Sequence, residues 1–227
     1  MINNVESVFD SLANEYDSWF DNEGHLIFKI EVRAFQEVLP SLPEPWLEVG
    51  VGSGRFAQAL GIDTGIDPSY GLARVARRRG INVFSSRGED SLFDQETFGA
   101  VFLIVTLCFV ESPTDVLLET RRILKRGGRL VIGLVLRDST WGQFYQNKKR
   151  QGHRFYRHAT FYSFEEVKSF LENTGFAIEK VLSTLSQKPG EVKRMEEPKQ
   201  GLYEDAGFVI IIASKKTAET VNHKSSY

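Results

Sequence analysis

The stretch Leu47–Phe56 reads LEVGVGSGRF and contains three glycines within five positions, directly after a short apolar run. Glycine loses more conformational freedom on folding than any other residue, so a cluster of glycines marks backbone that must turn tightly or let another group come very close. An ordinary turn needs only one or two glycines. Gly50, Gly52 and Gly54 therefore predict a specialised loop where a strand leads into a helix.

Short apolar runs alternate with amphipathic stretches along the chain, which is typical of an α/β fold built from βα units on a mostly parallel sheet. The expected strands are residues 46–49, 64–67, 81–86, 98–106, 129–136, 176–184 and 207–214. The expected helices are residues 26–39, 54–60, 69–80, 113–128 and 163–173, with Ser69 and Ser163 as N-caps. Because only a polar loop, 187–205, separates the last two strands, we expect them to pair antiparallel at the sheet edge.

Two stretches depart from this rhythm. Residues 137–162 combine seven aromatic residues with six Arg or Lys and one acid, without a clear period, and are predicted to be irregular. The last ten or so residues are predicted to be a frayed tail.

The composition excludes several classes of protein. The chain has 227 residues, of which 41% are hydrophobic and 26% charged, with a formal net charge of -2, so it gives no reason to expect attraction to nucleic acid or membranes. The single cysteine, Cys108, excludes internal disulfides and cysteine-based zinc sites, and no metal is expected. There is no secretory signal pattern, and the longest apolar run, Ala100–Val110, is well short of the roughly 18 residues of a membrane span. We therefore expect a cytoplasmic protein.

The glycine spacing separates classes of nucleotide-binding loop. A loop between a strand and a helix presents free backbone N–H groups to a ligand. A dinucleotide fingerprint would need glycine or alanine where Arg55 stands, and a phosphate-binding P-loop would need Lys followed by Ser or Thr. The chain has neither of these patterns.

With Glu48, the loop reads E-x-G-x-G-x-G and resembles the first motif of the class I methyltransferases that use S-adenosylmethionine. Further pieces follow in the order of that family: GIDPS (65–69), RGEDSLF (87–93) and RRILKRGGRLVIG (121–133). The segments ANEYDSWF (13–20) and FYSFEEVKSFLENTGF (161–176) are similar to the quinone-biosynthesis-like, or type 11, group, in particular to a small bacterial member. The resemblance covers residues 13 to 215.

The resemblance implies a Rossmann-like, seven-stranded, mostly parallel sheet with helices on both faces and the last strand antiparallel. It implies one methyltransferase domain over residues 1–227. Within it, residues 1–40 would form an N-terminal helical lid, 44–136 the cofactor-binding core, 137–162 a substrate-side insertion, and 163–215 a C-terminal helix with the antiparallel strand pair.

The resemblance also implies S-adenosylmethionine as cofactor, with S-adenosylhomocysteine as product, and a set of site residues. Asp67 would accept hydrogen bonds from both ribose hydroxyls, and Glu48 would lie beside the methionine part. The expected cofactor-binding residues are Tyr16, Glu48, Gly50, Gly52, Gly54, Asp67, Pro68, Gly88, Glu89 and Thr106. The expected substrate-pocket residues are Trp19, Phe20, Cys108, Phe109, Trp141 and Tyr145. Arg87 and Leu92 depart from the family's pattern near the adenine.

Some of these residues have a simpler explanation. The glycines could form only a tight turn, Asp67 could only cap the next helix, and the aromatic residues could only pack. Methyl transfer needs no obligatory general base, so no catalytic residue is assigned. His153, Tyr156 and His158 are candidates for accepting a proton, and each could instead be an exposed loop residue.

The substrate class is narrowed by what the chain lacks. The residues after the fourth strand read TLCF (106–109), not the Asn or Asp, Pro, Pro and aromatic pattern that marks amide and nucleobase methylation in this superfamily. We therefore expect in-line methyl transfer to a small molecule, anionic or aromatic, and no nucleic acid or membrane partner. Two alternatives stay open: a nicotinamide-dependent oxidoreductase on the same kind of sheet, and a non-catalytic cofactor-binding module. The sequence does not set the oligomeric state.

Overall fold

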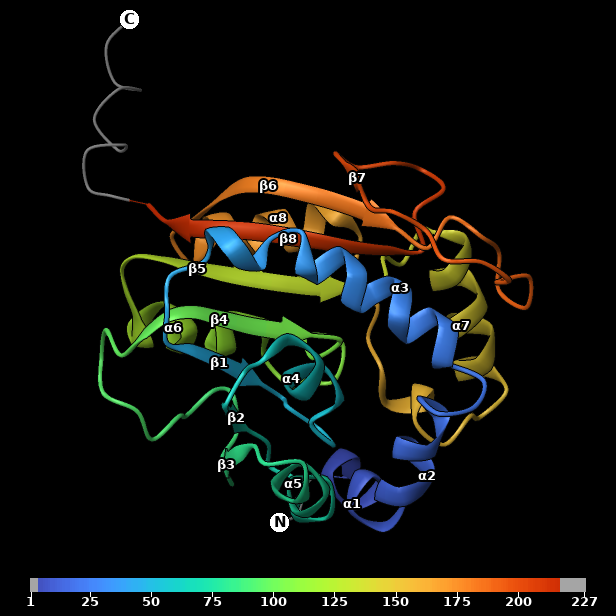
Figure 1. The fold of residues 1–227 in the computed structure, drawn as a ribbon, viewed down its shortest axis with the longest axis horizontal. Helices are drawn as coiled ribbons and strands as arrows, with labels where there is room; N and C mark the ends of the chain where they lie inside the picture. The colour runs from blue at the N-terminus through green and yellow to red at the C-terminus, as the bar shows by residue number, and fades with distance from the viewer. Residues whose placement is uncertain (1–3, 217–227) are drawn as a thin grey trace, which may run out of the picture.

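Eight strands form one sheet in the computed structural model, which describes residues 4–216 (Figure 1). The strands are β1 (Trp46–Val49), β2 (Thr64–Ile66), β3 (Asn82–Phe84), β4 (Phe98–Ile104), β5 (Leu124–Leu134), β6 (Phe176–Thr184), β7 (Lys199–Gln200) and β8 (Phe208–Lys215). Their order across the sheet is β3-β2-β1-β4-β5-β8-β6-β7. The predicted frayed tail, like residues 1–3 of the predicted domain, lies outside the described residues.

The direction of the strands confirms the predicted α/β class. Strands β1 to β5 pair in parallel, and β8 runs antiparallel to both β5 and β6. The predicted antiparallel pairing of the last two long strands is also confirmed, because β8 pairs with β6 on the β7 side of the sheet. One detail of the prediction was wrong. The sheet has eight strands rather than seven, because the exposed pair Lys199 and Gln200 forms a short strand beside β6 and carries no apolar pattern.

Helices cover both faces of the sheet (Figure 1). The helices are α1 (Asn4–Ser11), α2 (Ala13–Trp19), α3 (His25–Gln36), α4 (Arg55–Leu60), α5 (Tyr70–Arg78), α6 (Pro113–Ile123), α7 (Thr140–Arg150) and α8 (Phe164–Asn173), with short 3-10 turns η1 (Leu39–Ser41) and η2 (Tyr156–His158). Helices α3, α4 and α5 share one core with the sheet, and α6 and α8 share the other. Every residue of β4 is buried, with Phe102 in the first core and Leu103 in the second, because successive side chains of a strand point to opposite faces.

The predicted helix caps are confirmed. The Ser69 hydroxyl accepts a hydrogen bond from the Leu72 N–H at the start of α5, and Ser163 forms a capping box with Glu166 at the start of α8. These hydrogen bonds satisfy N–H groups that have no partner within the first turn of a helix.

The helix predicted over residues 113–128 is shorter in the structure. Helix α6 ends at Ile123, and β5 begins at Leu124, so Gly127 and Gly128 do not end the helix. The pairing of β5 with β4 shifts between Leu124 and Arg129, and Gly127 adopts φ +73° within that shift. The two glycines therefore allow an irregularity in the strand. In the sequence alone, such a pair of glycines cannot be told from one that ends a helix.

The segment 137–162, predicted to be irregular, contains the eleven-residue helix α7. The Ser139 hydroxyl accepts a hydrogen bond from the Gly142 N–H at 3.0 Å and so caps this helix. Trp141 and Tyr145 are its large buried residues. Two buried residues four positions apart, with the partly buried Phe144 between them, give too weak a helical period to detect in the sequence.

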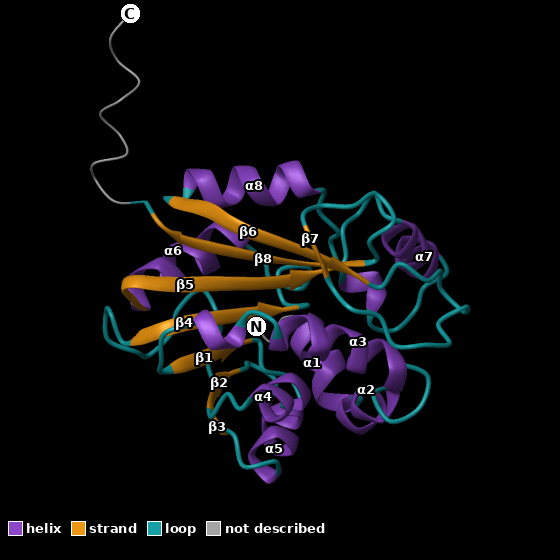
Figure 2. Ribbon diagram, turned by 45° about the horizontal axis from the view of Figure 1, so that its top comes forward, coloured by secondary structure: helices purple, strands orange, loops and turns teal. Residues whose placement is uncertain are grey.

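Helices α2 and α7 lie beyond the carboxyl ends of β1, β4 and β5 in both ribbon views (Figures 1 and 2). In open α/β sheets, ligands bind in the crevice outside the carboxyl ends of the strands. The fold therefore places the N-terminal helices and the 137–162 segment around the region where a ligand is expected.

Asp17 fastens α2 to the glycine loop and to α5. Its carboxylate accepts hydrogen bonds from Arg55 at 2.9 and 3.0 Å and from Arg79 at 2.7 Å. Arg79 also donates to the Ser53 carbonyl at 2.7 Å, and Arg55 donates to Asp21 at 2.7 Å. Burial opposes ionisation of Asp17, but the hydrogen bonds from Arg55 and Arg79 prevail and lower its pKa.

We expect Asp17→Asn to destabilise the protein by about 1–2 kcal/mol at pH 7, because it weakens charge-assisted hydrogen bonds of a side chain that is only partly screened by water. The folded-state pKa of Asp17 is lowered, so its contribution is present above the unfolded-state pKa of about 3.9 and is lost as the pH falls through the folded-state value. Urea unfolding at pH 7 and at pH 3 measures both points. The matched change Asp21→Asn, in a side chain that is 61% exposed, should have a much smaller effect. If Asp17→Asn lowered the free energy of unfolding by the same amount at both pH values, this account would be contradicted.

Candidate functional site

The glycine loop turns through the left-handed region at all three glycines. Gly50, Gly52 and Gly54 have φ values of +72°, +55° and +81°. A Cβ at Gly50 would lie 2.5 Å from the Thr106 side chain, and one at Gly54 would lie 2.9 Å from the Cβ of Ala76 in α5. Gly50 and Gly54 are therefore needed for close packing as well as for backbone conformation.

Gly52 differs from the other two glycines. The nearest side-chain atom to a Cβ built at Gly52 is a ring carbon of Tyr16, at 3.8 Å. This space is part of the cavities that the loop lines. The loop therefore exposes its backbone to a cavity at its middle glycine.

Asp67, directly after β2, holds this loop in place. One oxygen of its carboxylate accepts a hydrogen bond from the Gly52 N–H at 2.8 Å, and the other accepts one from the Ser69 N–H, also at 2.8 Å. Asp67 is not the N-cap of α5, because Ser69 has that role.

Glu48 is a buried acid in the middle of β1. Its side chain is only 2% exposed, and its Oε2 atom has no hydrogen-bond partner within residues 4–216. Burial, and then the negative charge of Asp67, raise the pKa of Glu48, while a backbone hydrogen bond from Ala57 acts in the opposite direction. A buried carboxyl group without a partner costs free energy unless another group supplies a hydrogen bond or a positive charge.

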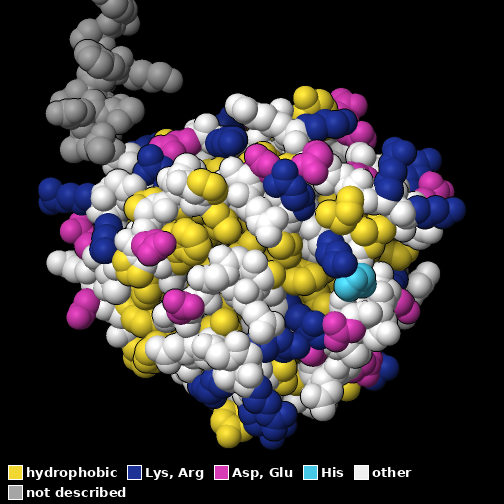
Figure 3. All heavy atoms as spheres, in the orientation of Figure 1, with side chains coloured by type: hydrophobic (Ala, Val, Ile, Leu, Met, Phe, Trp, Pro, Cys, Tyr) yellow, Lys and Arg dark blue, Asp and Glu magenta, His cyan; other side chains and the backbone are white. Residues whose placement is uncertain are grey.

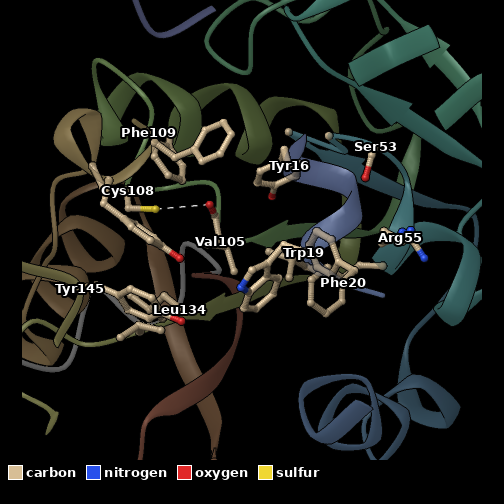
Figure 4. Close-up of a pocket in the computed structure, with 18 of the residues that line it drawn as sticks. Tyr16, Trp19, Phe20, Ser53, Arg55, Val105, Cys108, Phe109, Leu134 and Tyr145 are labelled. Atoms are coloured by element: carbon tan, nitrogen blue, oxygen red, sulfur yellow. Dashed lines mark hydrogen bonds between the residues drawn. The ribbon is translucent and has the colours of Figure 1, made fainter. Parts of the chain in front are cut away.

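Two adjoining cavities open at the carboxyl end of the sheet. The larger has a volume of about 530 Å³ and the smaller about 120 Å³, and Tyr16, Gly50, Gly52, Val105 and Phe109 line both. Figure 4 shows the larger cavity, with aromatic side chains of α2 on one side and side chains of the segment after β4 and of α7 on the other. The arrangement forms a chamber beside the glycine loop, with many aromatic side chains among its lining residues.

Most residues predicted for the site line these cavities. Those on the larger cavity are Tyr16, Trp19, Phe20, Glu48, Gly50, Gly52, Cys108, Phe109 and Tyr145. Those on the smaller one are Tyr16, Gly50, Gly52, Asp67, Pro68, Gly88, Glu89, Thr106 and Phe109. The Thr106 hydroxyl donates to the carbonyl of Val49 at 3.0 Å, so this side chain also ties the end of β4 to β1.

Three of the predicted residues do not line either cavity: Gly54, Trp141 and His158. Gly54 packs against α5. Trp141 is 3% exposed and donates its indole N–H to the Gln187 carbonyl at 2.8 Å, so it belongs to the core. The Nε2 atom of His158 accepts a hydrogen bond from the neighbouring Arg157 at 2.9 Å.

The other candidates for proton transfer do line the larger cavity. The Nδ1 atom of His153 is buried and has no hydrogen-bond partner in the described part of the chain. Burial, and then the charge of Lys148, lower the pKa of His153, so its ring is neutral near pH 7. Burial raises the pKa of Tyr156, and it raises that of the Cys108 thiol to about 12. The thiol donates to the Val105 carbonyl at 3.3 Å, as the dashed line in Figure 4 shows, and its raised pKa keeps it protonated near pH 7.

Several lining residues were missed from the sequence. The larger cavity also contains Glu31 from α3 and the aromatic rings of Phe155 and Phe161. Glu31 stands within the apolar stripe of the helix, four positions after the buried Ile27, and this misplaced acid is the signal that the sequence offered. Near the smaller cavity, Arg87 pairs with Glu111 at 3.3 Å.

The basic residues of the 137–162 segment mostly point away from the cavity. Of the six, only Lys148 is among the lining residues. Arg137 pairs with Glu166, and Arg154 pairs with Glu15, both at 2.8 Å. The positive charge of the segment therefore does not support the expectation of an anionic substrate.

The surface as a whole has mixed charge. Figure 3 shows acidic and basic side chains interspersed over one face of the molecule. Within residues 4–216, none of the helices has both the length and the apolar character that crossing a bilayer requires. Nor does this part of the chain bring together three or more His, Cys, Asp or Glu residues in a group suited to a metal ion.

The chain is similar to several known proteins. A family model described as a methyltransferase domain matches residues 47–132. An uncharacterised protein of Methanocaldococcus jannaschii is 40% identical over 209 residues, which are 92% of this chain and 99% of that one. A Mycobacterium tuberculosis protein, also uncharacterised, is 40% identical over 91% of this chain and 73% of its own length.

A solved structure extends the similarity to the whole fold. A protein of Thermotoga maritima, described as a SAM-dependent methyltransferase and possible histamine N-methyltransferase, has a TM-score of 0.86 and 37% sequence identity, covering 92% of this chain and 99% of that one. The glycine loop, the acid after β2, the sheet order and these similarities agree, and the chain belongs to the class I S-adenosylmethionine-dependent methyltransferases.

Proposed function

We propose that the protein transfers a methyl group from S-adenosylmethionine to a small molecule and releases S-adenosylhomocysteine. The observation that carries this proposal is the unpaired Oε2 atom of Glu48, buried on the cavity wall beside a loop whose middle glycine leaves its backbone open. The description of the Thermotoga maritima neighbour as a possible histamine N-methyltransferase supports a small-molecule acceptor.

The residues around the two cavities fit this cofactor. The α-ammonium group of the methionine part would supply the positive charge that Glu48 lacks, and the backbone at Gly52 would lie against the same part of the cofactor. The Asp67 carboxylate, beside the smaller cavity, would accept hydrogen bonds from the ribose hydroxyls, with Gly88 and Glu89 on the adenosine side.

The bound cofactor would supply a methyl group activated by a positively charged sulfur. The chain's own contribution is to align the acceptor and to exclude water from the chamber. The aromatic side chains of α2 form one wall of that chamber, and the Asp17 ion pairs hold this helix against the glycine loop. The N-terminal helices therefore act as the lid.

His153 is the residue we assign to proton acceptance, where the acceptor loses a proton. It lines the larger cavity, its lowered pKa keeps it neutral, and its buried Nδ1 atom has no partner in residues 4–216. Tyr156 stays protonated because burial raises its pKa, and the hydrogen bond between its hydroxyl group and that of Tyr145 acts in the same direction.

Calorimetry tests the choice of cofactor. We expect S-adenosylmethionine and S-adenosylhomocysteine to bind with dissociation constants on the order of micromolar, or about -8 kcal/mol, and NAD not to bind. The reverse preference would exclude a methyltransferase and favour an oxidoreductase. Binding without turnover of S-adenosylmethionine by any acceptor in a broad panel would favour a non-catalytic module.

A matched pair of glycine variants tests the role of the loop. Both Gly52→Ala and Gly54→Ala place alanine at a positive φ, at a cost of roughly 1–2 kcal/mol each. Gly54→Ala adds a contact of 2.9 Å with Ala76, so it should lower the melting temperature further and leave cofactor affinity nearly unchanged in the folded protein. Gly52→Ala should mainly weaken cofactor binding, since its new methyl group projects into the cavity. Equal effects of both variants on affinity would disprove this division of roles.

Asp67→Asn tests the ribose contact. Removing the charge should weaken S-adenosylhomocysteine binding by roughly 2–4 kcal/mol, or about 30-fold to 1000-fold. Some stability should be lost as well, because an amide nitrogen of asparagine would face one of the two backbone N–H groups that Asp67 now binds. Ser112→Ala, which removes the cap of α6 and should cost about 1 kcal/mol, is the control for lost stability. If Asp67→Asn weakened binding no more than Ser112→Ala, Asp67 would be only a loop anchor.

A further inference from the structure

Glu31 is a second buried acid on the larger cavity, and the proposed chemistry does not use it. Its side chain is 6% exposed, and no hydrogen bond or ion pair to its carboxyl group is found within residues 4–216. Burial alone raises the pKa of Glu31, to about 8. An unpaired acid in the apolar stripe of a core helix lowers stability, so the free protein gains nothing from it.

The surroundings of Glu31 are aromatic. Glu31 lines the same cavity as Tyr145, Tyr156 and Phe161. Its charge also contributes, after burial itself, to raising the pKa of both tyrosines. The rings of these two tyrosines have centroids 4.5 Å apart, and the Phe161 ring is parallel to that of Tyr145 within 4°, at 6.3 Å. A carboxyl group beside several aromatic faces is the combination of groups that binds an organic cation.

The cavity does not supply that cation from its own side chains. Arg55 is held by Asp17 and Asp21. Lys148 lies over the ring of Phe144, 4.9 Å from its centroid, and forms no ion pair with Glu31. Within residues 4–216 no side chain supplies the positive charge that would make burial of Glu31 favourable, which leaves a ligand as its source.

Glu31 and Glu48 belong to different ends of the chamber. The charged neighbour that acts on Glu48 is Asp67, on the side of the glycine loop. The groups that feel the charge of Glu31 are Tyr145 and Tyr156, on the side of α7 and η2. Tyr16 lies where the two cavities meet, because its side chain lines both of them. One buried acid is thus available for the cofactor and the other for the acceptor.

We propose that Glu31 is the counter-ion for an organic ammonium group of the methyl acceptor, and that the substrate class is therefore amines with an apolar body. The inference rests on the proposed methyltransferase function, in that the amine is taken to be the acceptor; its nitrogen attacks the methyl carbon after the ammonium group has passed a proton to the Glu31 carboxylate, which frees the lone pair. The aromatic rings around Glu31 hold the apolar body, and the carboxylate selects for positive charge. Neutral and anionic molecules of the same shape are rejected, because they leave the acid unpaired or bring a second negative charge beside it.

Binding of amines and their uncharged counterparts to the protein saturated with S-adenosylhomocysteine tests this proposal. The probes are 2-phenylethylamine against 2-phenylethanol, and cyclohexylamine against cyclohexanol, in calorimetry at pH 8. We expect the protein to bind each amine at least about tenfold more tightly than the matching alcohol. Glu31→Gln, which keeps the shape and removes the charge, should abolish that preference while changing alcohol binding less than about twofold.

Glu37→Gln is the matched control, because it makes the same change on an exposed position of the same helix, where Glu37 pairs with Arg33. It should leave the amine preference intact. Glu31→Gln should bind S-adenosylhomocysteine as the unchanged protein does and should be no less stable. No amine preference in the unchanged protein, or a preference that survives Glu31→Gln, would overturn the role of Glu31. Failure of the unchanged protein to bind S-adenosylhomocysteine would instead overturn the proposed function, so the two failures are distinguishable.

Discussion

The hydrogen bond from the Gly52 N–H to the Asp67 carboxylate joins two strands that meet at the carboxyl edge of the sheet. A loop with three residues at positive φ cannot form regular secondary structure, so its N–H groups need partners elsewhere. The Ile66 carbonyl accepts from Gly50 and from Val51, and Asp67 accepts from Gly52. The end of β2 thus sets the shape of the loop after β1, and the cavities, the lid contacts and the start of α4 all follow from that shape.

Features that depend on local chemistry could be read from the sequence. The glycine spacing, the acid after β2 and the serine caps each require particular residues at particular positions, and β1 and β6 match their predicted bounds. Features that depend on contacts between distant parts of the chain could not be read from the sequence. The two-residue strand β7 has no pattern of its own, and α7 exists because Trp141 and Tyr145 find partners far along the chain. Trp141 was assigned to the pocket because an aromatic residue looks the same in the sequence whether it packs or binds.

The two buried acids lower the stability of the free protein and are available to bind a ligand. Glu48 and Glu31 both have raised pKa values caused mainly by burial, which means that each opposes folding when ionised. A protein selected only for stability would replace them with apolar residues of similar volume. Their burial in a chamber lined by many aromatic side chains is instead the kind of local conflict that concentrates at functional sites.

The place of β8 has a consequence for the order in which the chain can be assembled. Strands β1 to β5 and their helices are complete once residue 134 has been synthesised, but β6 cannot join these strands until β8, which ends at Lys215, is available to lie between β5 and β6. During synthesis the edge of β5 is therefore open, and an open edge strand can pair with another chain. The polar segment between β6 and β8 must fold back before that edge is closed, which makes the C-terminal strand the step that protects the nascent protein from aggregation.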